Sequence, residues 1–177
     1  WTAKALAVTL VALVTATVVS TAYWLGLWLA IRSRDVPILD GALADSLLYG
    51  LRGAGFAAAA ALGGYALTML FRSTVATIGV LFAVSIAGGV FIGLIGLGEQ
   101  WQPQKNVAAI VKNGTQYFSD PPESCYAGPR GDQRPEPNSE CDPYHDLSAW
   151  SGLGYYGAAL VLVGGASVLS FRRRDVP

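Results

Sequence analysis

Residues 5–31 read ALAVTLVALVTATVVSTAYWLGLWLAI, a stretch of 27 residues without Asp, Glu, Lys or Arg. A helix of about 20 apolar residues crosses the hydrocarbon core of a membrane, which is about 30 Å thick. Residues 53–71, 73–98 and 147–171 also carry no charged side chain. The first stretch is too long for the apolar part of a cleaved signal peptide. We therefore expect an all-α membrane protein with four transmembrane helices, at about 5–31, 47–71, 74–98 and 147–171.

The composition of the whole chain agrees with this fold class. Of 177 residues, 53% are hydrophobic and 14% are charged, and 12 basic residues balance 12 acidic ones. A net charge of zero argues against a nucleic-acid-binding protein. Four apolar helices in so short a chain leave too few residues to cover them in water, which excludes an ordinary soluble domain.

Basic residues next to the predicted helices set their orientation, because Lys and Arg in short loops stay on the cytoplasmic side. Arg172, Arg173 and Arg174 follow the last helix directly, so we expect the C-terminus inside. The turn at Arg72 and the N-terminal Lys4 then also lie inside. The segment 32–52 and the long loop 99–146 lie outside. Three arginines in the first outer segment oppose the rule, but three aspartates offset them, namely Arg32, Arg34, Arg52, Asp35, Asp40 and Asp45.

The long loop carries the features of an extracellular segment. The only two cysteines, Cys125 and Cys141, both lie in it, and we expect a disulfide because thiols oxidise outside the cell. Such a bond stabilises by about 3 kcal/mol in the chain-entropy model. A metal site of these cysteines with His145 is the alternative, although further ligands at the usual spacing are missing. Four of the five tryptophans also mark the outer face, namely Trp24, Trp28, Trp101 and Trp150.

The first part of this loop predicts a short amphipathic helix. It begins at Pro103, places Val107, Ile110 and Val111 on one face and ends at Gly114. This helix either lies on or dips into the outer interface, or packs on the ends of the transmembrane helices. The second part, residues 120–146, is rich in Pro, Gly and acidic residues, and we expect the disulfide to determine its shape. Asp146 or Ser148 is expected to cap the last helix.

Small residues recur within the predicted transmembrane helices at spacings that allow close helix packing. Because lipid chains are as apolar as the helices, such stripes indicate contact with other protein helices, in this chain or in a partner. They are not a cofactor site. The packing candidates are Gly55 and Gly63 in the second helix, Gly89 and Gly93 in the third, and Gly157 and Gly164 in the fourth.

Residues with catalytic or transport chemistry are scarce. None of the four charge-free stretches holds the ionisable residue that many carriers place inside the membrane. Asp45 and Arg52 share a helical face near the outer end of the second helix and are candidates for gating, but the favoured explanation of Arg52 is an arginine that snorkels to the interface. His145 and Ser151 lack the further groups of a hydrolase. The sequence has no nucleotide-binding or haem-attachment motif, so we expect no enzyme and no cofactor.

Three stretches resemble the ABC-2 type permease family, the membrane subunits of bacterial ABC transporters. They are WTAK at residues 1–4, GGYALTMLFRST at 63–74 and SFRRRDV at 170–176. The resemblance implies that the chain covers spans three to six of six, and that the segment around Val107–Val111 is an extracellular re-entrant element. It further implies a separate ATPase subunit, a second permease copy or paralogue, and the bacterial cytoplasmic membrane. The segment from Asp120 to Cys141 is longer than expected for the family.

A non-transporting scaffold or sensor subunit is the alternative function, in which the acidic outer loop binds a partner. The permease hypothesis and the scaffold hypothesis differ in the sequence that they expect before Trp1. Because Lys4 already abuts a full-length helix, we expect this chain to be the later part of a longer protein. Two further spans and an amphipathic helix would favour the permease.

Overall fold

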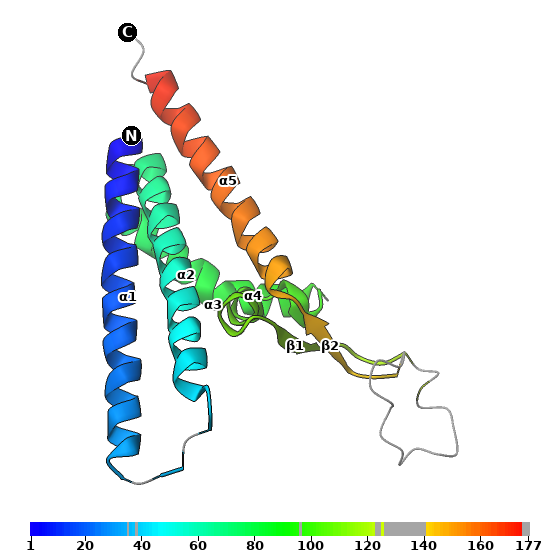
Figure 1. The fold of residues 1–177 in the computed structure, drawn as a ribbon. Helices are drawn as coiled ribbons and strands as arrows, with labels where there is room; N and C mark the ends of the chain where they lie inside the picture. The colour runs from blue at the N-terminus through cyan, green and yellow to red at the C-terminus, as the bar shows by residue number, and fades with distance from the viewer. Residues whose placement is uncertain (35, 38, 96, 123–124, 126–140, 175–177) are drawn as a thin grey trace. The chain divides into compact units, whose positions relative to one another are not determined.

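The computed structural model describes residues 1–34, 36–37, 39–95, 97–122, 125 and 141–174 (Figure 1). The chain forms two compact units, one from residues 1–82 and 154–177 and one from residues 83–153. The elements are α1 (Thr2–Arg32), α2 (Ala42–Phe71), α3 (Thr74–Leu94), η1 (Glu99–Trp101), α4 (Pro103–Lys112), β1 (Thr115–Phe118), β2 (Tyr144–Leu147) and α5 (Ala149–Arg174).

The described residues include four helices that are long and apolar enough to cross a membrane, as the sequence predicts. The largest differences from the expected spans lie at the start of the second helix and at the end of the third. The second helix begins earlier, at Ala42, because its first turns carry Asp45 and other residues that can lie beyond the hydrocarbon. The third ends earlier, at Leu94, and the extended backbone of Gly98 leads into η1 instead.

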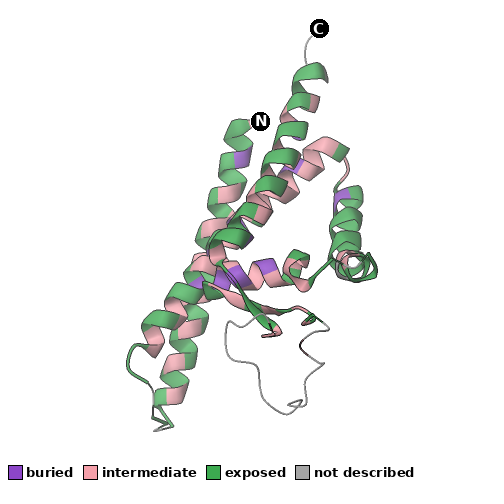
Figure 2. Cartoon of the chain, turned by 90° about the vertical axis from the view of Figure 1, so that its right-hand side faces the viewer, coloured by how far each residue is buried: buried purple, intermediate pink, exposed green. Residues whose placement is uncertain are grey.

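The long helices expose their apolar side chains. Figure 2 shows few buried residues on them, and the buried ones in the first unit are mostly alanines, such as Ala54, Ala58 and Ala66. Large apolar side chains on α1 are exposed, for example Leu6, Val11 and Val14. A soluble monomer rarely exposes so large an apolar surface, whereas lipid accommodates it. The chain is therefore a multi-pass membrane protein.

Three helices form the first unit together with the start of α3. The helices α1 and α2 run antiparallel and pack along their length (Figure 1). Close to the loop that joins them, the rings of Trp24 and Tyr49 lie 5.9 Å apart, and at the other end those of Trp1 and Tyr65 lie 5.7 Å apart. The helix α5 contacts α2 through Tyr156 against Phe56, with ring centres 5.0 Å apart.

Hydroxyl side chains in the membrane-spanning helices bond to their own backbone. Thr9 donates to the Ala5 carbonyl at 2.8 Å, and Thr68 donates to the Gly64 carbonyl at 2.8 Å. In lipid, each polar group must find a partner within the protein, and a bond to the preceding turn satisfies it.

A tight turn joins α2 to α3. Arg72 takes a left-handed conformation with φ 54°, and its amide donates to the Thr68 carbonyl to end α2. The Ser73 hydroxyl accepts from the Ala76 amide at 3.2 Å, which starts α3.

The second unit contains a strand pair that the sequence does not predict. The strands β1 and β2 are antiparallel, with Thr115 opposite Leu147 and Phe118 opposite Tyr144. Before β1, α4 ends at Asn113, which takes a left-handed conformation with φ 63°, and Gly114 follows with φ 127°. These two residues redirect the chain from α4 into β1. The expected loop helix is confirmed, with an end slightly before Gly114.

Candidate functional site

The helix α4 packs on the first turn of α5 within the second unit. A Cβ at Gly152 would lie 2.6 Å from the carbonyl oxygen of Asn106 and 2.9 Å from Ile110 Cγ1. Since real Cβ atoms essentially never come this close to backbone, only glycine allows this contact. Gly152 is buried and was not among the glycines expected to mediate packing.

The beginning of α4 lies against α3. A Cβ at Gly88 would be 3.9 Å from Pro103, and the Gln104 side chain donates to the Ser85 carbonyl at 3.4 Å. Ser85 lies nine residues before the end of α3 at Leu94, about 13 Å along the helix axis at 1.5 Å per residue. The chain therefore turns back after α3, and α4 starts beside the middle of that helix. Of the two expected placements of the loop helix, these contacts favour packing on the transmembrane helices.

A buried amide fixes the approach to α4. The Asn106 side chain is 2% exposed, and its Nδ2 donates to the carbonyls of Gln100 at 2.8 Å and Gln102 at 3.0 Å. A buried amide without such partners would be costly. Asn106 thereby holds η1 against α4. The sequence gives a weak signal of this role, a polar residue next to the apolar face of a short helix.

An ion pair covers the outer edge of β1. Lys105 Nζ lies 2.8 Å from Glu99 Oε2. The same carboxylate accepts from the Phe118 amide at 3.0 Å, and Lys105 donates to the Gln116 carbonyl at 3.2 Å. The hydrogen bonds from Lys105 and from the Phe118 amide hold the pKa of Glu99 below its ordinary value. The pair thus satisfies backbone groups that an unpaired strand edge would expose.

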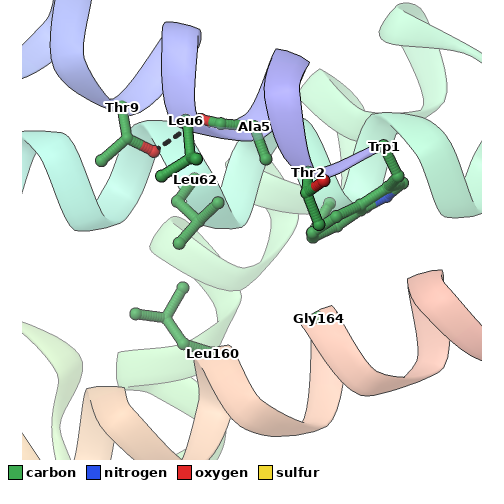
Figure 3. Close-up of a pocket in the computed structure, with 9 residues that line it drawn as sticks. Trp1, Thr2, Ala5, Leu6, Thr9, Leu62, Leu160 and Gly164 are labelled. Atoms are coloured by element: carbon green, nitrogen blue, oxygen red, sulfur yellow. Dashed lines mark hydrogen bonds between the residues drawn. The ribbon is translucent and has the colours of Figure 1, made fainter.

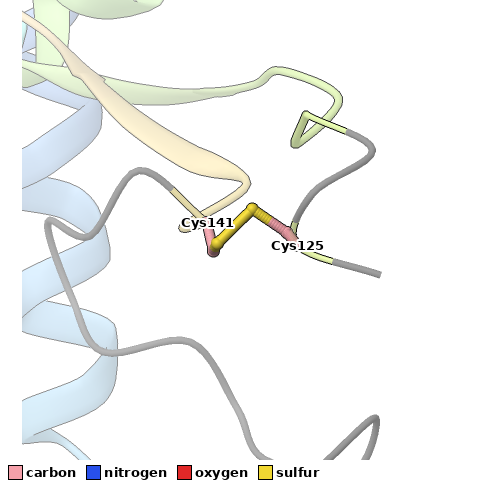
Figure 4. The surroundings of a disulfide bond; sticks show 2 residues. All are labelled: Cys125 and Cys141. Atoms are coloured by element: carbon pink, nitrogen blue, oxygen red, sulfur yellow. A yellow bond between two sulfur atoms is a disulfide. The ribbon is translucent and has the colours of Figure 1, made fainter. Parts of the chain in front are cut away.

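Cys125 and Cys141 form a disulfide, which confirms the expected pairing (Figure 4). Their Cα atoms lie 5.6 Å apart. The alternative metal site with His145 is wrong, because both sulfurs are bonded to each other. His145 instead faces Tyr117 across the two strands, with ring centres 5.6 Å apart. The residues between the cysteines lie outside the described part of the chain.

The remaining polar candidates at the start of α5 have structural partners. Ser148 Oγ accepts from the Ser151 amide at 3.2 Å, so Ser148 rather than Asp146 caps the helix. Asp146 instead accepts from the Gln116 side chain at 3.3 Å. Among the described residues, no hydrogen bond joins His145 to Ser151, and no group of three potential metal ligands gathers.

The candidate gating pair is not joined in the structure. Asp45 lies exposed in the first turn of α2, and Arg52 is half-buried further along the same helix. No ion pair links these two described side chains. A gating role for Asp45 and Arg52 stays a prediction.

The glycine stripes contact other helices of this chain at one of the expected positions. A Cβ at Gly63 would meet Leu160 of α5 at 3.2 Å. The surroundings of Gly89 lie outside the described residues. Four further expected positions have no atom within 4 Å of an added Cβ, namely Gly55, Gly93, Gly157 and Gly164. Their expected role in packing against a partner stays a prediction.

Basic residues gather at one end of the three-helix unit. Trp1 contacts Tyr65 and donates from Nε1 to Ser167 Oγ at 3.3 Å, so the beginning of α1 meets the last turns of α2 and α5. Arg72 follows Tyr65 by seven residues and Arg172 follows Ser167 by five, about 7–10 Å along each axis. The basic residues at this end are Lys4, Arg72, Arg172, Arg173 and Arg174.

Comparisons with known proteins identify no relative: no family model, curated protein or solved structure matches this chain. The sequence and structure of the chain itself therefore carry the functional conclusion.

Proposed function

We propose that the chain is part of the permease subunit of an ATP-driven transporter of the ABC type, in the bacterial cytoplasmic membrane. The observation that carries this proposal is the path of the chain between α3 and α5. After α3, α4 starts beside Ser85 and Gly88 and then packs on Gly152. A short helix that turns back along a transmembrane helix fits the extracellular re-entrant element of the ABC-2 permeases, which the sequence resembles.

The basic end of the three-helix unit supports an orientation with the C-terminus inside. The distribution of basic residues in the sequence assigns Lys4, Arg72 and Arg172 to the cytoplasm. These residues lie at three helix ends, which the contacts of Trp1 hold close to one another. The disulfide then lies on the oxidising side, as expected for Cys125 and Cys141. On this proposal, the substrate moves between two permease copies or paralogues and hydrolysis of ATP occurs on a separate subunit.

The decisive experiment purifies the tagged full-length protein from its own host in mild detergent. A stoichiometric ATPase subunit and vanadate-sensitive ATP hydrolysis are the expected results. Recovery of the protein without any ATPase would overturn the proposal. As a matched pair, Gly152→Leu should reduce the coupled hydrolysis because it displaces α4, and Gly154→Leu should not, since its Cβ meets no atom within 4 Å.

Orientation is tested separately through the disulfide. In intact cells, an impermeant reductant followed by an impermeant maleimide should label Cys125 and Cys141. A single added cysteine at Arg173, which is exposed, should be labelled only after the membrane is permeabilised. The opposite pattern would place the C-terminus outside.

A second function, a scaffold or sensor that binds a partner outside the cell, is favoured by one observation. The unit of residues 83–153 is held by the strand pair, the Glu99–Lys105 ion pair and the disulfide. A unit held by these interactions can present a fixed surface to a protein partner. Copurification with an extracellular protein in place of an ATPase would support this function.

A further inference from the structure

An apolar groove of about 360 Å³ lies between α1, α2 and α5 in the three-helix unit. Figure 3 shows the Trp1 indole at one end and the side chains of Leu62 and Leu160 at the other. Gly164 lines the groove, and a Cβ there would meet no atom within 4 Å. Pockets of about 300–1,000 Å³ hold small ligands. The groove is therefore large enough for a segment of one hydrocarbon chain, though not for a whole lipid.

The groove lies between helices that lipid surrounds, so its apolar walls are within reach of acyl chains. The Trp1 indole N–H donates to Ser167, which satisfies it, and the ring lines one end of the groove. Leu62 and Ala66 of α2 and Leu160 of α5 complete a lining that is almost wholly apolar. Water in such a groove would find few hydrogen-bond partners, whereas an alkyl chain needs none.

Positive charge at the Trp1 end of the groove favours an anionic headgroup on a lipid whose acyl chain lies in the groove. Arg172 follows Gly164 by eight residues in α5, which places it about 12 Å further along the helix axis. An acyl chain that starts beside Gly164 thus has its phosphate near the level of Arg172 and Arg173, both exposed. The basic residues at this end are Lys4, Arg72, Arg172, Arg173 and Arg174. Clusters of four or more basic residues next to a transmembrane helix favour anionic lipids.

We propose that this groove binds one acyl chain of an anionic phospholipid and that Arg172 and Arg173 hold its phosphate. One guanidinium group can donate two parallel hydrogen bonds to the oxygens of a phosphate, and a phosphate at the mouth of the groove allows this geometry. The proposal rests on the membrane location of the helices and not on the transport function. A scaffold with the same three helices would carry the same lipid site.

Native mass spectrometry of the full-length protein in detergent, titrated with phosphatidylglycerol or phosphatidylcholine, tests this site. The wild type should retain one phosphatidylglycerol with an affinity at least about fivefold above that for phosphatidylcholine. Arg172→Gln with Arg173→Gln should abolish this preference. Both side chains are exposed, so this variant should fold normally.

Gly164→Leu tests the groove itself, because the new side chain enters the empty space there. It should weaken phosphatidylglycerol binding about tenfold or more, while Gly154→Leu in open space on the same helix leaves it unchanged. Equal binding of the two lipids by the wild type would overturn the proposal. Equal binding of phosphatidylglycerol by the Gly164→Leu and Gly154→Leu variants would also overturn it. A wild-type protein that is a dimer in detergent and a Gly164→Leu variant that is a monomer would overturn it too, because the groove would then hold a helix of a second copy.

Discussion

Lys105 and Glu99 form an ion pair, with Nζ 2.8 Å from Oε2, that occupies the place of a neighbouring strand beside β1. The carboxylate accepts from the Phe118 amide and the ammonium donates to the Gln116 carbonyl. A strand of four residues in a two-stranded sheet has little stability of its own. The pair therefore links β1 to η1 and α4 and helps to make the residues 83–153 one unit.

Replacing Glu99 tests this link. Glu99→Ala removes the acceptor for the Phe118 amide, so hydrogen exchange at that amide should accelerate. Global stability should change by only about 0–1 kcal/mol, because both side chains are partly exposed. Lys112→Ala, an exposed position at the end of the same helix α4, is the matched control and should leave the Phe118 amide protected. Unchanged protection in Glu99→Ala would contradict the role of the pair.

The protection of Phe118 should depend on pH. Because the pKa of Glu99 is lowered in the folded protein, its contribution is fully present above the ordinary carboxyl value of about 4.3 and is lost as the pH falls through the lower folded value. Protection factors corrected for intrinsic exchange should therefore decline only below about pH 4. In Glu99→Gln, which does not titrate, the same pH series should be flat. A decline near neutral pH would point to another group.

Gly152 should be indispensable for the contact between α4 and α5. Gly152→Ala brings a Cβ to 2.6 Å from the Asn106 carbonyl, and the helices must move apart. We expect a loss of about 1–3 kcal/mol, measured as lower thermal stability in detergent. Gly154→Ala has no such neighbour and should stabilise the helix by up to about 1 kcal/mol. Equal effects of the two substitutions would show that α4 does not pack here.

Gly50 should play the corresponding role in the hairpin of α1 and α2. A Cβ there would overlap the Ser20 hydroxyl and lie 3.0 Å from Trp24 Cδ1. Gly50→Ala should therefore destabilise, while Gly53→Ala in open space should stabilise by up to about 1 kcal/mol. Thermal unfolding in detergent compares the two variants. The same sign for both would mean that α1 and α2 separate without cost at this point.

The sequence predicts the long helices well, because charge-free stretches must satisfy their backbone within the helix once they enter lipid. It also predicts the disulfide, since Cys125 and Cys141 are the only cysteines. The pairing of β1 with β2 could not be predicted, because residues 115–118 and 144–147 are far apart in the sequence and pair only in the folded chain.

The contacts of the glycines in the candidate site could not be predicted for the same reason, since they too depend on residues distant in the sequence. Spacing alone selected Gly55 and Gly157, which have no neighbour within 4 Å of an added Cβ, and missed Gly50 and Gly152, which do. What a glycine contacts depends on the residue of the partner helix, such as Ser20 or Asn106. Spacing along one helix does not contain this information.

The hydroxyl of Tyr65 in α2 is buried. Among the buried side-chain polar atoms of the described residues, it alone has no hydrogen-bond partner. A buried donor without a partner costs about 1–3 kcal/mol. Tyr65→Phe removes the hydroxyl and retains the ring contact with Trp1, so it should leave stability unchanged or raise it by up to about 1 kcal/mol. Tyr49→Phe, which retains the ring contact with Trp24 at a more exposed site, is the matched control and should be neutral. Thermal unfolding in detergent and in phospholipid nanodiscs measures both. A loss for Tyr65→Phe in nanodiscs alone would show that a lipid or a water molecule in the membrane satisfies this hydroxyl.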